Sequence, residues 1–256
     1  MTSGRSALLL IALAAAACDR TARTPAGTTL DVRELLGGAD TLHARAIDPR
    51  EFDFPRDHGP HPQFRTEWWY FTGNLTSDGG RELGYQLTFF RSALTDSVSF
   101  AAGSPAERSP WRTRHAYMAH FAVTDADADR FHAEERFARG AAGLAGANGE
   151  PLRVWLEGWS AESLSHATFP LRLRASARDI AIDLVLDRGK PVVLQGERGL
   201  SRKGAERGNA SYYYSLTRMP SRGTIRTPSG TWTASGTSWL DREWSTSALS
   251  PGVAGW

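Results

Sequence analysis

Arg65-Thr-Glu-Trp-Trp-Tyr-Phe-Thr-Gly-Asn-Leu75 places four aromatic side chains in a row directly behind a carboxylate. Each aromatic side chain gains about 2 kcal/mol or more by burial, so an exposed loop would not retain them. The stretch is therefore typical of a strand. Ser77-Asp-Gly-Gly80 follows as a hairpin turn, and Leu83-Gly-Tyr-Gln-Leu-Thr-Phe-Phe90 is expected to pair back on the first strand.

The rest of the chain is a succession of short strand patterns separated by turn residues. The clearest is Ile180–Leu186, in which apolar residues occupy every second position. Residues 133–142 would form at most a short helix, and Ala101–Pro110 and Arg139–Gly149 would be long loops that cover an open end. The pattern predicts an all-β protein, an antiparallel barrel or sandwich, with further strands near 115–123, 153–159, 169–175, 192–195, 211–216, 223–226 and 231–237.

The length, net charge and aromatic content of the chain indicate which kinds of partner it could bind. A chain of 256 residues can bury a sizeable core as one large β domain or two small ones. The formal charge of +2 is nearly balanced and the arginines are scattered, so no nucleic-acid partner is expected. Nine Trp and eleven Phe residues could line a large apolar pocket, or could form an ordinary aromatic core.

The N-terminal residues have the features of a lipoprotein signal. Arg5 supplies a positive charge, Ala7–Ala17 an apolar segment too short to span a bilayer, and Cys18 follows a run of alanines. Residues 1–17 are therefore expected to be a signal peptide, and lipid on Cys18 would anchor the chain to the periplasmic face of a cell-envelope membrane. Residues 18–50 would be a flexible tether. Because Cys18 is the only cysteine, no intramolecular disulfide can form.

Two further blocks carry a family resemblance. Trp239-Leu-Asp-Arg-Glu-Trp244 is a second aromatic and acidic stretch, and Tyr212-Tyr-Tyr214 lies between it and the first. Together the three blocks resemble the bacterial lipocalin-like group that includes AttH proteins and carotenoid 1,2-hydratases. The resemblance implies a lipocalin-like domain over residues 51–245. Proteins of this kind continue into a second lipocalin-like half, of which residues 246–256 would be the start.

The resemblance also implies a chemistry. In the hydratases an acid protonates a double bond, aromatic faces stabilise the cation, and water adds. Asp241 is the candidate acid, since flanking tryptophans would desolvate it and favour the protonated form; alternatively it is a structural partner of Arg242. The hydratases carry His, Trp and Tyr where this chain has Tyr212, Tyr214 and Trp239, so activity on carotenoids is not expected. The candidate catalytic residues are Asp241, Glu67, Tyr212 and Tyr214.

The leading hypothesis is a lipocalin-like protein that holds an apolar ligand, isoprenoid-like or acyl-like, in an aromatic cavity without a cofactor. The alternatives are a hydratase or lyase that uses Asp241, and a non-catalytic accessory component of an ABC-type export system. The residues expected to line the cavity are Trp68, Trp69, Tyr70, Tyr85, Trp239 and Trp244.

Other motifs indicate less. Glu67 is expected to form an ion pair with Arg65 at the barrel mouth. His58 and His61 lack the further ligands that a metal site requires. Asp125–Asp129 imitates a calcium loop, but its following residues do not fit, and it is expected to be a solvated turn. No Gly-x-Ser-x-Gly nucleophile motif and no phosphate-binding glycine loop is present.

Overall fold

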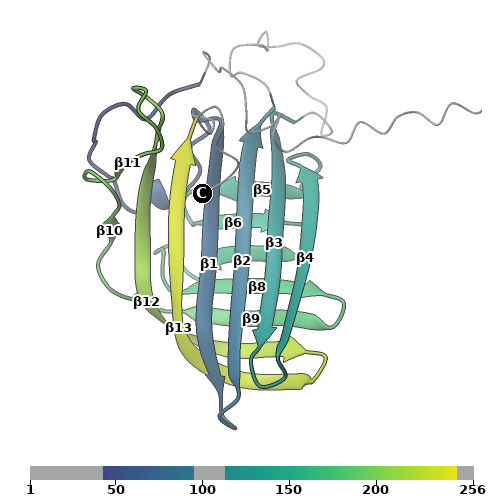
Figure 1. Ribbon diagram of the computed structural model, residues 1–256. Coiled ribbons are helices and arrows are strands. Elements are labelled where there is room, and N and C mark those ends of the chain that lie inside the picture. The colour runs from purple at the N-terminus through teal and green to yellow at the C-terminus, as the bar shows by residue number, and fades with distance from the viewer. Residues whose placement is uncertain (1–42, 95–112, 247–256) are drawn as a thin grey trace, which may run out of the picture. The chain divides into compact units, whose positions relative to one another are not determined.

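The computed structural model describes residues 43–94 and 113–246. In this part of the chain the protein is all-β, and the one helical element is a single 3-10 turn (Figure 1). None of the described helical segments is long and apolar enough to cross a membrane. The elements are η1 Arg56–His58, β1 Thr66–Ser77, β2 Glu82–Ala93, β3 His115–Asp125, β4 Arg130–Arg139, β5 Ala145–Asn148, β6 Arg153–Leu156, β7 Trp159–Ser163, β8 Leu171–Ala177, β9 Ile180–Leu186, β10 Val193–Leu194, β11 Leu200–Arg202, β12 Ala210–Thr227 and β13 Gly230–Ser245.

The strands form one antiparallel sheet in the order β4-β3-β2-β1-β13-β12-β9-β8-β7-β6-β5, with β10 and β11 paired to β12. The sheet curls until β6 packs against β2, β3 and β4, so it nearly closes into a barrel. Figure 1 shows the long strands side by side, with β5, β6, β8 and β9 crossing behind them. At the open seam, Arg136 on β4 donates to the Ser176 carbonyl oxygen at 3.2 Å and pairs with Glu157 at 3.1 Å. The predicted antiparallel, lipocalin-like fold is confirmed.

The two longest strands join the halves of the sheet. The sequence suggested separate strands at 211–216 and 223–226, but both belong to β12, whose register against β13 shifts between Leu216 and Met219. Beyond this bulge β12 pairs with β9 as well as β13. Gly223 makes this close pairing possible, because its φ is 152° and a Cβ there would lie 2.1 Å from the Asp183 carbonyl oxygen.

Alternation sets which side chains enter the barrel. On β1 the side chains of Glu67, Trp69 and Phe71 are buried, whereas Trp68 and Tyr70 on the other face are half-buried. Aromatic rings contributed by distant strands meet inside, as where Phe121 on β3 lies 5.6 Å from Trp159 on β7 between ring centroids. The interior is thus packed with large side chains, and this packing supplies most of the stability.

Several local predictions were wrong. Residues 133–142 were predicted to form at most a short helix, but 130–139 form β4, because pairing with β3 overrides the helix propensity of its Ala, Glu and Arg residues. The stretch 153–159 is not one strand, since a turn at Glu157 and Gly158 divides it into the hairpin β6–β7. The loop predicted at 139–149 contains β5. The loop predicted at 101–110 lies outside the described residues.

The turn expected at Asp125–Asp129 is present at residues 126–129 and is mostly exposed, but its first residue differs from the prediction. Asp125 is fully buried. Its carboxylate accepts hydrogen bonds from Arg81 at 2.8 Å and from the Thr227 hydroxyl at 3.0 Å. Asp125 therefore ties three hairpin ends together.

Candidate functional site

A buried ionic cluster lies inside the barrel beneath the segment that carries η1. Glu67 is 0% exposed, and its two carboxylate oxygens pair with Arg91 from β2 and Arg242 from β13, which are also buried. The His61 backbone N–H donates to the same carboxylate at 3.0 and 3.1 Å. Burial alone would raise the pKa of Glu67, but the charges of Arg91 and Arg242 hold it well below its usual range. Glu67 is thus an interior anion rather than an ion pair at the barrel mouth.

The two arginines hold the covering segment in place. Arg242 donates to the Gly59 carbonyl oxygen at 2.6 Å and stacks over Trp69, with its guanidinium carbon 3.9 Å from the ring centroid. Arg91 donates to the Phe64 carbonyl oxygen at 2.7 Å and to that of His61 at 3.1 Å. The position of residues 58–64 therefore depends on charged groups whose own positions depend on Glu67.

A second acidic residue extends the cluster towards the surface. Asp57 accepts from the His61 ring at 3.0 Å and pairs with Arg50 at 2.5 Å. Burial would raise the pKa of Asp57, but the hydrogen bonds from His61 and Arg50 lower it strongly. The His61 ring lies flat against Trp244, with a centroid distance of 3.7 Å and an interplanar angle of 6°. The His61 ring is therefore held by Asp57 at Nε2, by Arg242 at Nδ1 and by Trp244 against one face.

His58 lies beside this cluster and faces a cavity. Its Nδ1 is 2.6 Å from the Tyr214 hydroxyl, and its ring packs 4.7 Å from that of Phe54. Burial, together with the positive charges of Arg242 and Arg188, lowers the pKa of His58 to about 4 although Asp57 opposes the shift. The imidazole is therefore neutral at neutral pH. Burial raises the pKa of Tyr214 well above its usual range, so its hydroxyl keeps its proton.

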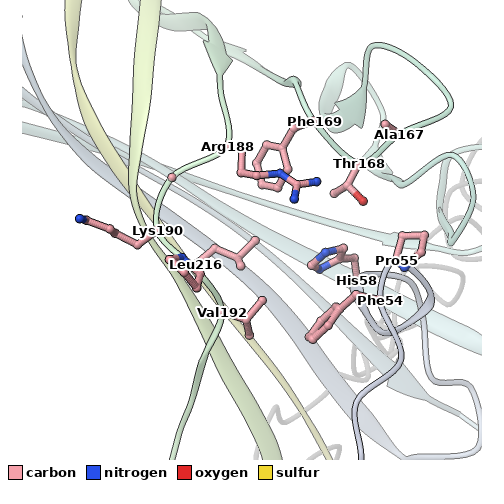
Figure 2. Close-up of a pocket in the computed structure, with 12 residues that line it drawn as sticks. Phe54, Pro55, His58, Ala167, Thr168, Phe169, Arg188, Lys190, Val192 and Leu216 are labelled. Carbon is pink, nitrogen blue, oxygen red and sulfur yellow. The ribbon is translucent and has the colours of Figure 1, made fainter.

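The cavity has a volume of about 600 Å³. Three loops and one strand enclose it: the η1 segment, the residues before β8, the connection from β9 to β10, and β12 (Figure 2). Most of its wall is apolar, and Figure 2 shows the His58 ring, the Arg188 guanidinium and the Thr168 hydroxyl turned towards its interior. The lining residues are Phe54, Pro55, His58, Ala167, Thr168, Phe169, Arg188, Gly189, Lys190, Pro191, Val192 and Leu216.

A second cavity, also of about 600 Å³, adjoins the first. The two share Phe54 and Val192 in their walls. The second is more open and includes Phe52, Leu194 and Arg198. Arg50 and Glu51 also line the second cavity, so its wall carries more charge than that of the first.

Asp241 lies on the opposite, outer face of the sheet. Its carboxylate accepts a hydrogen bond from the Ser215 hydroxyl at 2.5 Å and one from the Trp239 indole N–H at 2.6 Å. Trp239 is 37% exposed, and with Asp241 it lines a hollow of about 520 Å³ that also includes Thr72 and Arg218. Burial and the charge of Asp241 raise the pKa of the neighbouring Tyr213 to about 12.

The sequence profile of one family, described as AttH-like, matches residues 45–256. The chain belongs to the AttH-like family. This AttH-like chain is similar to a solved structure from Nitrosomonas europaea that carries the AttH designation, with 34% identity and a TM-score of 0.70 over 83% of this chain and 61% of the other. A second solved structure, kievitone hydratase from Nectria haematococca, shares the fold at 13% identity and a TM-score of 0.54, over 82% of this chain and 57% of the other. The AttH-like chain thus spans less than two thirds of either protein. No curated protein matches its sequence.

The structure divides the predicted site residues of this AttH-like chain between two faces of one sheet. Register places Tyr212 opposite Trp244 and Tyr214 opposite Arg242, so both tyrosines point inward, whereas Asp241 faces Ser215 on the outside. Tyr213 lies on the other face from its two neighbours, as alternation along a strand requires. The inward group is Glu67, Trp69, Tyr85, Tyr212, Tyr214 and Trp244, and the outward group is Trp68, Tyr70, Trp239 and Asp241.

Sequence reasoning missed the polar residues of the main cavity. His58 was considered only as a metal ligand, and the described residues contain no group of His, Cys, Asp or Glu side chains able to hold a metal ion. The sequence did offer one signal for a site at His58: the residue lies between Phe54 and Pro60, in a proline-containing segment that cannot form a strand and is therefore a loop. Arg188 carried no signal in the sequence. Cys18, the predicted lipidation site, lies outside the described residues.

Proposed function

We propose that this AttH-like protein binds an apolar small molecule, acyl-like or isoprenoid-like, in the cavity beside His58. The observation that carries the proposal is the cavity itself. Its volume of about 600 Å³ falls within the range of small-molecule sites. Its wall is mostly apolar, and only a few polar groups converge on it, as expected of a site that orients one end of a ligand. The aromatic residues in this wall are Phe54 and Phe169, not the tryptophans that the sequence favoured.

Filling the cavity tests the proposal. We expect Val192→Trp to lower the affinity for the neutral apolar fluorophore Nile red at least about tenfold, because Val192 lines both cavities and the indole would fill space beside it. Fluorescence titration measures the affinity. Val193→Trp is the matched control, since the neighbouring side chain is 43% exposed and lines neither cavity. Equal Nile red binding by the two variants would contradict a ligand site at this cavity.

Hydration at Asp241 is the second candidate function. Asp241 lies partly beneath Trp239 at a hollow, and the fold is shared with a protein named kievitone hydratase. As a general acid, Asp241 would give its proton to one carbon of an alkene while water adds to the other. The Asp241 carboxylate is already engaged by the Ser215 hydroxyl and the Trp239 indole N–H, and Asp241 does not line the main cavity, which is why we place this function second.

Isotope labelling separates the two functions. After incubation with an envelope lipid extract in ¹⁸O-labelled water, we expect native mass spectrometry to show a bound apolar molecule without added label. Asp241→Asn should bind the same molecule equally well, because Asp241 lies outside the cavity. A product that carries one labelled water, and that Asp241→Asn no longer forms, would establish the hydratase instead. A folded chain with no bound molecule would favour an accessory role in an export system.

We also propose that lipid on Cys18 attaches the protein to a cell-envelope membrane. The support is the sequence alone: a positive charge at Arg5, a short apolar segment and a small-residue run before the cysteine. A membrane anchor would place the cavity close to a source of apolar ligands. We expect the wild-type protein to be labelled by a radioactive or tagged fatty acid and the Cys18→Ser variant not to be labelled. Equal labelling of the two proteins would contradict the proposal.

A further inference from the structure

The polar groups at the main cavity are hydrogen-bond donors. The Tyr214 hydroxyl lies 2.6 Å from His58 Nδ1 and 3.4 Å from the Asp57 carbonyl oxygen, and we assign its single hydrogen to the shorter contact, with Nδ1 as the acceptor. A neutral imidazole that accepts at Nδ1 carries its proton on Nε2. His58 is only 6% exposed, and within the described residues its Nε2 takes part in no hydrogen bond. The Nε2–H donor therefore faces the cavity without a protein acceptor.

Arg188 supplies the positive charge of the cavity. Its guanidinium lies 5.8 Å from the centroid of the Phe169 ring and points into the space that His58 faces (Figure 2). No carboxylate of residues 43–94 or 113–246 pairs with it. Among the described residues, no Asp or Glu lines this cavity. The Lys190 ammonium, by contrast, points away from His58 and Arg188 in Figure 2.

Several arginines of this protein pair with carboxylates, as Arg172 does with Asp183 at 2.6 Å and Arg81 with Asp125 at 2.7 Å, whereas Arg188 has no such partner among the described residues. The Arg188 guanidinium and the neutral His58 ring are both hydrogen-bond donors in a mostly apolar wall. A ligand bound there would have to supply the acceptor oxygens itself. Because burial and the neighbouring charges hold the pKa of His58 at about 4, its ring adds a donor without adding a second positive charge.

We propose that the ligand of this cavity is an anionic amphiphile, an apolar chain that ends in a carboxylate or a phosphate. Arg188 would pair with the anionic group and His58 Nε2–H would donate to it. The apolar chain would lie against Leu216 and Val192 and, if long enough, pass Phe54 into the second cavity. This inference rests on the proposed function, because it names the class of ligand for the same site.

The test compares three probes of equal chain length by isothermal titration calorimetry. Dodecanoate and dodecyl phosphate carry the two candidate head groups, and dodecanol is their neutral counterpart. We expect one or both anions to bind about tenfold or more tightly than dodecanol, because a charge-assisted hydrogen bond contributes at least that much. The better of the two anions identifies the head group, carboxylate or phosphate.

Variants of the protein assign the preference to named groups. Arg188→Met should bring the ratio of anion to dodecanol affinity close to one. His58→Asn should reduce the ratio in part, because its amide oxygen can accept from Tyr214 where Nδ1 does, but no donor replaces Nε2–H. Arg202→Met is the control for net charge, since its side chain is 62% exposed and lies outside both cavity walls. It should leave the ratio unchanged.

The outcomes separate this inference from the function it rests on. Equal affinities of wild type for dodecanol and both anions would overturn the inference and leave an apolar binding site in place. A loss of the preference in Arg202→Met as large as in Arg188→Met would also overturn it, since the effect would then be one of net charge. Failure of all three probes to bind would count against the proposed function itself.

Discussion

Glu67→Gln is expected to lower the free energy of unfolding by about 3–5 kcal/mol, because it leaves the guanidinium groups of Arg91 and Arg242 buried without their anion. The amide of Gln has the same shape but no charge, so the loss reports electrostatics rather than packing. In a domain of this size the midpoint of thermal unfolding should fall by about 10 °C. Urea unfolding followed by tryptophan fluorescence measures the change.

A surface ion pair gives the matched control. Asp183 pairs with Arg172 at 2.6 Å, a closer contact than most, yet its side chain is 41% exposed. Asp183→Asn should cost less than about 1 kcal/mol, since water already screens the charges. If Glu67→Gln cost no more than Asp183→Asn, the two arginines would be satisfied by backbone carbonyl groups alone, and Glu67 would not be the centre of the cluster.

The same variant links the cluster to the cavity. Arg242 holds the Gly59 carbonyl oxygen and Arg91 holds that of Phe64, and Glu67 orients both arginines. His58, the last residue of η1, lies at the start of the segment that leads from η1 to β1 and at the edge of the cavity. The buried charges are therefore expected to fix the geometry of a site that none of them lines, as a supporting layer does around many binding sites.

The strands were predictable because period-two alternation is a local property of the sequence. The register of β1 with β2 and the strict alternation of β9 follow from residues 65–90 and 180–186. The division of Tyr212 and Tyr214 from Tyr213 follows in the same way. The strand at 130–139 could not be recognised from alternation. Its Ala, Glu and Arg residues have no strand preference of their own, and they form a strand because they pair with β3.

The site was less predictable because its parts are far apart in sequence. Glu67 is 24 residues from Arg91 and 175 from Arg242, and no periodic pattern relates positions so distant. His58 and Arg188 come from connections whose conformations are set by tertiary contacts. The resemblance to hydratases drew attention to Asp241, but only the register of β12 and β13 shows that it faces away from the inward tyrosines.

Acidification from pH 6.5 to pH 4 is expected to destabilise the folded chain through the buried His58 and the half-buried His115. Burial, with the charges of Arg242 and Arg188, lowers the pKa of His58 from 6.5 to about 4, and burial with the charge of Arg91 does the same for His115. Between these values the unfolded chain binds protons that the folded chain does not, so stability is fully present above pH 6.5 and is lost as the pH falls towards 4. His58 alone should account for about 3 kcal/mol.

His58→Asn isolates this contribution. The variant cannot take up a proton, so the free energy of unfolding, measured in urea at a series of pH values, should fall less steeply between pH 6.5 and 4 than in wild type. His166→Asn, in an exposed turn, should leave the slope unchanged. A wild-type slope in His58→Asn would mean that the folded chain already binds a proton at His58. Two buried glutamates also change the stability at low pH. Below pH 4.5, protonation of Glu67, whose pKa is lowered, decreases the free energy of unfolding further, whereas protonation of Glu243, whose pKa burial raises, increases it. The contribution of the histidines is therefore best measured between pH 6.5 and 4.5, where Glu243 alone of these two glutamates opposes it.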